Sequence, residues 1–218
     1  MKTPQTFFTT LAYFTFLGAS LAVATAAPVD DAVPDDTVAD DTVAGDKKTA
    51  TTEAAKPIVM KLKNLTLTVP ATWREADTQS RMRLTTLEIP AAKDGKQKGE
   101  LAVFHFAGGG GGLQQNIDRW IGQFSAEGRT SKLVKGKAGD EEYHILELSG
   151  TFNKSVGPPI MRKTEAVEGY RMLGAIVPVG SEVYYLKLTG PDAAIKAAAK
   201  DFRKSFGGQM KSEEAVKL

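Results

Sequence analysis

Apolar and polar residues alternate along several segments of the chain, which is the pattern of half-buried β-strands. Pro, Gly and charged residues separate these segments and provide the turns. A charged turn connects the segments 83–90 and 100–107. The segment 100–107 is apolar on both faces, which predicts a central strand. The seven predicted strands are 60–69 (with a one-residue slip at Asn64), 83–90, 100–107, 130–139, 142–152, 170–179 and 182–190.

Two other segments carry apolar residues at helical spacing. The first helix follows five consecutive glycines, and its stripe is Leu113, Ile117, Trp120, Ile121 and Phe124. We expect Trp120 to pack in the core, because its neighbours on the stripe are apolar.

The second helix closes the domain. Pro191 suits its first position, and Gly207 is placed to cap its end. Its apolar stripe is Ile195, Ala198, Ala199, Phe202 and Phe206. The element order predicts an α+β fold, an antiparallel β-sheet of about seven strands with helices packed on it.

The glycine run before the first helix raises the possibility of a phosphate-binding loop. A P-loop requires Lys and then Ser or Thr after the last glycine, but Leu113, Gln114 and Gln115 follow Gly112. The dinucleotide pattern requires a third glycine where Leu113 stands. We therefore interpret residues 108–112 as a flexible corner between a central strand and a helix.

The two ends of the chain differ in composition from its centre. Residues 1–27 have a positive start, an uncharged apolar run and small residues before a cleavage point, so they are predicted to be a signal peptide. The alternative is an uncleaved membrane anchor. Residues 28–56 contain eight acids and three lysines and no aromatic residue, which predicts a disordered acidic linker. Residues 57–207 form the single predicted domain, and residues 208–218 are predicted to be a frayed tail.

The composition limits the possible chemistry. The chain has no cysteine, which excludes disulfides, thiol nucleophiles and thiolate metal sites. His105 and His144 are its only histidines and both lie in predicted strands, so packed or interstrand positions are expected. No catalytic residue, metal ligand or cofactor site is predicted. Scattered basic residues without interleaved aromatics also argue against nucleic-acid binding.

Candidate contact residues for a partner lie around the first helix and in two loops. Trp73 follows a proline turn and could cover the sheet edge or anchor a partner from an exposed position. A Gly-Pro-Pro loop with apolar residues ahead of two cations could contact a protein or an anionic membrane surface, and the default alternative is a solvated loop. The candidates are Trp73, Arg74, Arg119, Pro158, Pro159 and Arg162.

Three motifs together resemble the Mog/PsbP-like domain group, which includes secreted bacterial members. They are LTVPATW (67–73), NIDRWIGQF (116–124) and YYLKLTGP (184–191), in the predicted order of elements. The resemblance spans most of residues 57–207. It implies an α/β/α sandwich and a non-enzymatic role in binding partners, and it supplies no catalytic residue.

We therefore expect an exported binding module, periplasmic or extracellular, that engages a protein partner and has no stable membrane span after signal cleavage. One alternative is a carrier of a small apolar ligand, held in a cleft between sheet and helix. A weaker alternative is an envelope hydrolase, which would need one of the histidines in a cleft beside a nucleophile.

Overall fold

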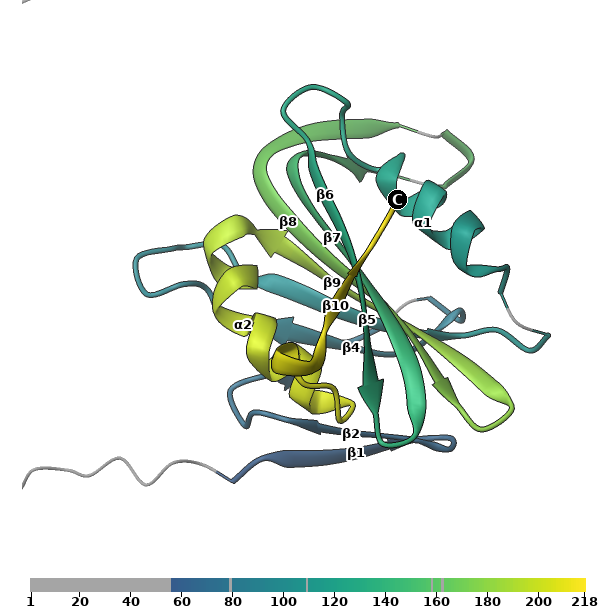
Figure 1. The fold of residues 1–218 in the computed structure, drawn as a ribbon. Coiled ribbons are helices and arrows are strands. Elements are labelled where there is room, and N and C mark those ends of the chain that lie inside the picture. Colours follow the sequence, from purple (N-terminus) through teal and green to yellow (C-terminus); the bar gives the residue numbers. More distant parts are fainter. Residues whose placement is uncertain (1–55, 79, 109, 158, 162) are drawn as a thin grey trace, which may run out of the picture. The chain divides into compact units, whose positions relative to one another are not determined.

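The computed structural model describes residues 56–78, 80–108, 110–157, 159–161 and 163–218. The predicted leader and all of the predicted linker except Lys56 lie outside the described residues. Eight antiparallel strands form one sheet in the order β10-β6-β7-β8-β9-β5-β4-β3 (Figure 1). Their bounds are β3 Arg74–Glu75, β4 Arg83–Ile89, β5 Gly99–His105, β6 Thr130–Ala138, β7 Glu141–Ser155, β8 Thr164–Val179, β9 Glu182–Pro191 and β10 Glu214–Val216.

The other elements of the described residues are a hairpin, two helices and two 3-10 turns. Strands β1 (Ile58–Leu62) and β2 (Leu65–Val69) pair only with each other. The helices are α1 (Leu113–Ile121) and α2 (Asp192–Ser205), and the 3-10 turns are η1 (Pro159–Met161) and η2 (Met210–Ser212). The predicted α+β class with an antiparallel sheet is confirmed, and β5 is a central strand, paired with β4 and β9.

The single strand predicted for residues 60–69 is wrong, because these residues form the β1–β2 hairpin. Lys63 has a positive φ of 56° and, with Asn64, makes a two-residue turn. Leu62 pairs with Leu65, so both point to the same face and the alternation slips by one residue at the turn. Tyr184 donates a hydrogen bond to the Asn64 side chain, which in turn donates to the Val179 carbonyl at 3.0 Å.

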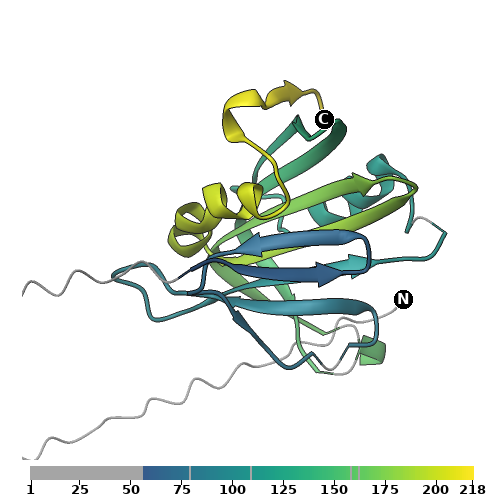
Figure 2. The same ribbon diagram turned by 90° about the horizontal axis from the view of Figure 1, so that it is seen from below.

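Each face of the large sheet carries its own apolar cluster. The first cluster joins Tyr143 and Ile145 of β7 to α2 and to the β1–β2 hairpin. The hairpin and α2 lie side by side on this face (Figure 2). The second cluster joins Leu146 and Leu148 of β7 to α1 and the segment after it. Alternate residues of one strand therefore serve two different layers.

Helix α1 packs on the second face through Ile117, Trp120 and the following Phe124, which are at most 5 % exposed. The predicted core position of Trp120 is confirmed. A Cβ built on Gly174 of β8 would lie 2.5 Å from the Trp120 ring, so the missing side chain makes room for the indole. Leu113 departs from the predicted stripe, since it is 36 % exposed at the start of the helix.

The described glycines ahead of α1, Gly108 and Gly110 to Gly112, form a corner. Gly108, Gly110 and Gly111 have positive φ values of 88°, 55° and 95°, which favour glycine. The Asn116 side chain donates to the carbonyls of residues 110–112 at 3.0 to 3.3 Å. The Tyr185 hydroxyl also donates to the Gly111 carbonyl at 3.0 Å. These contacts fix the corner through its carbonyl oxygens.

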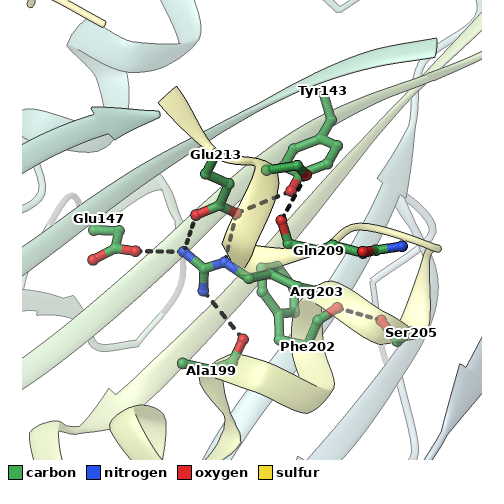
Figure 3. A network of polar contacts seen from close by, with 9 residues as sticks. Tyr143, Glu147, Ala199, Phe202, Arg203, Ser205, Gln209 and Glu213 are labelled. Carbon is green, nitrogen blue, oxygen red and sulfur yellow. Dashed lines mark hydrogen bonds and ion pairs between the residues drawn. The ribbon is translucent and has the colours of Figure 1, made fainter. Parts of the chain in front are cut away.

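The C-terminal segment is ordered, so the prediction of a frayed tail over 208–218 is wrong. Helix α2 ends at Ser205, Gly207 turns the chain with a φ of 89°, and η2 leads into β10, which pairs antiparallel with β6. Glu213 accepts hydrogen bonds from Arg203 at 2.6 and 3.1 Å and from the Tyr143 hydroxyl at 3.0 Å (Figure 3). Arg203 also contacts Glu147 and donates to the Ala199 carbonyl. This network ties the tail to the sheet.

Both helices within the described residues fall short of the length and apolar character that crossing a bilayer would require.

Candidate functional site

Helix α1 covers only part of the second face, and the uncovered part is hollowed. A cavity of about 540 Å³ lies over β4, β5 and β9 and reaches the far parts of β7 and β8. Register places Thr86, Ala102, Lys187 and Gly174 side by side across four neighbouring strands. Trp120 fills the space over Gly174, so Lys187 lies at the boundary between the covered and the open part of the face.

The lining of this groove combines aromatic and polar side chains. Phe104 of β5, Phe152 of β7 and Tyr170 of β8 line it, and Ala102 forms part of its floor. The rings of Phe152 and Tyr170 stack with centroids 5.8 Å apart and an interplanar angle of 3°. Gln123, just after α1, completes the wall on the helix side. A pocket with apolar walls and few polar groups is the usual form of a small-molecule site.

Lys187 is the most perturbed charged group of the groove. Burial lowers its pKa to about 8, and the positive charges of Arg83 and Arg119 act in the same direction against the opposing effect of Glu100. Its ammonium donates to the Gln123 side chain and lies 5.1 Å from the centroid of the Phe152 ring. These neutral partners compensate only part of the lost hydration.

Thr189 lies two residues after Lys187 on the same face of β9 and also lines the groove. Its hydroxyl is the only buried side-chain nitrogen or oxygen without a hydrogen-bond partner in the part of the chain that the structure describes. Such groups are rare, because leaving one unsatisfied costs about 1 to 3 kcal/mol. The hydroxyl thus lacks an acceptor, and only a molecule seated directly against β9 could supply one.

The charges around the groove are unequal. Two carboxylates line it, and each has a cationic partner: Arg83 lies 2.9 Å from Glu100, and Lys98 lies 2.6 Å from Glu88. In the described residues, no carboxylate lies within ion-pair distance of the other two cations, Lys154 and Lys187. The groove thus carries a surplus of positive charge.

The sequence-predicted contact residues that the structure describes are not gathered into one site. Trp73 is 3 % exposed in the core that also contains β2 and α2, so the interpretation as an exposed partner anchor is wrong for its side chain. A hydrogen bond from its amide to the Pro70 carbonyl, 3.0 Å long, closes the turn that points it inward. Arg74 is exposed on the edge strand β3.

The other candidate contact residues fall on α1 and on the β7–β8 loop. Arg119 lies on the exposed side of α1 and donates to the Asn116 side chain. Pro158 and Arg162 lie outside the described residues, and Pro159 begins η1. The role of Arg119, Pro158, Pro159 and Arg162 in binding a partner stays a prediction.

The two histidines occupy interstrand positions, as expected. The His105 side chain is 4 % exposed, with one ring nitrogen bonded to Glu182 and the other 3.1 Å from the Lys63 amine. The His144 ring lies 3.7 Å from Glu142, and burial lowers its pKa. Among the described residues, no three His, Asp or Glu side chains are grouped closely enough to hold a metal ion.

The sequence contained a signal for the groove that alternation obscured. In the second half of β9, Lys187 and Thr189 alternate with Leu186 and Leu188, and alternation assigns such polar residues to solvent. Whether Lys187 and Thr189 face solvent or a groove depends on how far α1 extends across the sheet. That extent is a tertiary property, so the sequence pattern did not identify either residue.

Neither a scan of protein-family models nor a search of curated proteins found a match for this chain. Solved structures show distant likenesses. The chain is similar to the cyanobacterial PsbP protein CyanoP of Synechocystis sp. PCC 6803, with 12 % identity, 76 % of this chain and 96 % of that chain covered, and a TM-score of 0.43. It is also similar to PA94 of Pseudomonas aeruginosa, a protein of unknown function, with 10 % identity, 68 % and 92 % coverage and a TM-score of 0.38.

Proposed function

We propose that the domain is an exported, non-enzymatic binding module of the Mog/PsbP-like type, an α/β/α sandwich, and that its ligand occupies the groove beside α1. The three sequence motifs and the apolar leader support the class and the export. The two apolar clusters on opposite faces of the sheet support the layered arrangement.

The groove is the observation that carries this proposal. Its volume of about 540 Å³ lies within the range of small-molecule pockets, roughly 300 to 1,000 Å³. It combines stacked aromatic rings with one desolvated amine and one unsatisfied hydroxyl. A bound molecule would exclude water from the rings and satisfy the polar groups. Carriage of a small ligand in a cleft between sheet and helix therefore becomes the favoured form of binding.

A protein partner remains the second candidate, favoured by the tip of the β7–β8 hairpin. Ile160 and Met161 of η1 are 90 % and 68 % exposed, although soluble domains usually keep large apolar side chains covered. The exposed Lys163 follows them. Ile160→Asp and Met161→Asp test this role, since the loss of a specific envelope partner in a pull-down would support it.

The groove is tested by native mass spectrometry of the exported protein and by binding of N-phenyl-1-naphthylamine, a neutral apolar dye. Ala102→Phe would fill the floor of the groove, and Ala166→Phe adds the same bulk at an exposed site on β8. We expect wild type and Ala166→Phe to bind the dye and Ala102→Phe to bind at least about tenfold more weakly. Circular dichroism verifies that both variants fold. A wild-type protein that carries no adduct and binds no dye would contradict the proposal.

A further inference from the structure

We infer that the groove binds a small aromatic acid, with its anionic group held by the Lys187 ammonium and the Thr189 hydroxyl and its flat body placed against Ala102 and the surrounding rings. The inference rests on the proposed function, because it names the class of ligand for the same groove.

The Lys187 ammonium is buried beside neutral partners. It is largely removed from water, but its observed partners are an amide oxygen and an aromatic ring rather than a carboxylate. A buried cation usually has an anionic partner, because its lost hydration is otherwise poorly replaced. An incoming anion would supply that partner in a site of low dielectric, where the attraction is strong.

Thr189 is placed to share a ligand group with Lys187. It lies two residues along the same face of β9, so its Cα is about 7 Å from that of Lys187. Side chains of this length can converge on one group between them. A carboxylate or sulfonate has several acceptor oxygens, so it can accept from the ammonium and from the hydroxyl that has no partner within the described residues.

The carboxylates of the groove are paired with two of its cations. Glu100 is the register partner of Thr189 across β5 and β9, and alone it would repel an anion. Its carboxylate is bound by Arg83 at 2.9 Å, which leaves the groove with a net positive charge through Lys187 and Lys154. A cationic or neutral ligand would leave that surplus without compensation.

The walls of the groove favour a planar apolar ligand body. Ala102 lies next to Lys187 in the adjacent strand and leaves space above the sheet. Phe104 lies on one side of this space, and the stacked pair Phe152 and Tyr170 lies on the other. A planar apolar body fits beside rings of this kind because aromatic groups favour offset or edge contacts.

Two dyes test the inference: 8-anilinonaphthalene-1-sulfonate is anionic, and N-phenyl-1-naphthylamine has the same ring framework without the sulfonate. We expect wild type to bind the sulfonate more tightly. Lys187→Met should weaken sulfonate binding about tenfold or more and leave neutral dye binding within twofold, since it removes a charged hydrogen bond. Thr189→Val should weaken sulfonate binding about threefold. Lys187→Arg, which keeps the charge, should restore most of the affinity.

A second hollow requires a control. Lys200, Lys204 and Lys211 surround a cavity at the end of α2 that could also attract a sulfonate. Lys204→Met should therefore leave the affinity unchanged. If Lys204→Met abolishes binding while Lys187→Met does not, the inference is overturned. If Lys187→Met leaves sulfonate binding intact while the neutral dye still binds in the groove, the inference fails and the proposed function stands. If neither dye binds wild type, both fail.

Discussion

Replacing Lys187 by Met should stabilise the protein at neutral pH. The substitution keeps an unbranched side chain of similar length beside Phe152 and Gln123 and removes a charge that burial disfavours. A lysine that functions in ligand binding commonly lowers the stability of the empty protein.

The magnitude follows from the pKa of Lys187, which burial lowers from 10.5 to about 8. A shift of this size corresponds to about 3 kcal/mol, at 1.36 kcal/mol for each unit of pKa. Below pH 8 the amine is protonated in both states, so the full penalty applies to the folded state. Between pH 8 and 10.5 only the unfolded chain keeps the proton, and the stability of wild type rises relative to the variant.

Urea unfolding at pH 7, 8, 9 and 10 measures this difference. We expect Lys187→Met to exceed wild type by up to about 3 kcal/mol at pH 7 and to lose most of this advantage by pH 10. Lys132→Met, at an exposed position on β6, is the matched control and should stay within about 0.5 kcal/mol of wild type throughout. The reasoning is refuted if Lys187→Met is less stable than wild type at pH 7, or if the difference does not change with pH.

Two further substitutions test the packing that surrounds the site. Glu213→Ala removes the main partner of Arg203, which is 1 % exposed, and should lower the free energy of unfolding by about 3 to 5 kcal/mol in thermal or urea unfolding. The control Glu214→Ala should lower it by less than about 0.5 kcal/mol. Equal losses of stability in the two variants would contradict the role of the network. Gly174→Ala places a Cβ 2.5 Å from the Trp120 ring and should lower the free energy of unfolding by about 1 to 3 kcal/mol. The control Gly112→Ala has open space around its Cβ and should not destabilise the protein. An unchanged Tm for Gly174→Ala would contradict the close packing.

The strands of the sheet were predictable because burial on two faces leaves a clear local pattern. The predicted segment 182–190 corresponds to β9, and both of its neighbours in the sheet were also predicted. The segment 60–69 failed at one point, because a two-residue turn and a strand irregularity give the same slip in alternation. The positive φ of Lys63 was not detectable, since lysine is not a typical residue for that conformation.

The C-terminal strand was not predictable because its stability depends on long-range contacts. The segment after Gly208 is short, polar and charged, which is the composition of a frayed end. The Glu213 side chain is nevertheless only 8 % exposed, because Arg203 of α2 and Tyr143 of β7 surround its carboxylate. Burial and the hydrogen bond to Glu213 raise the pKa of Tyr143 to about 12, so its hydroxyl remains a donor at neutral pH. Arg203 itself appeared in the sequence as an ordinary basic residue at a helix end.

The groove exists because α1 is shorter than the face on which it packs. Its nine residues span about 14 Å, and they cover the face over β6, β7 and β8. The same face of β5 and β9 carries Ala102, Lys187 and Thr189, a small residue and two polar ones. A second helix over these strands would have to bury the amine and the hydroxyl without partners, which is unfavourable. These polar side chains are therefore incompatible with a closed apolar layer and compatible with a bound molecule that carries its own acceptor oxygens. Substituting both Lys187 and Thr189 by apolar residues should remove this incompatibility and leave a purely apolar groove, which retains the neutral dye and loses the preference for the sulfonate.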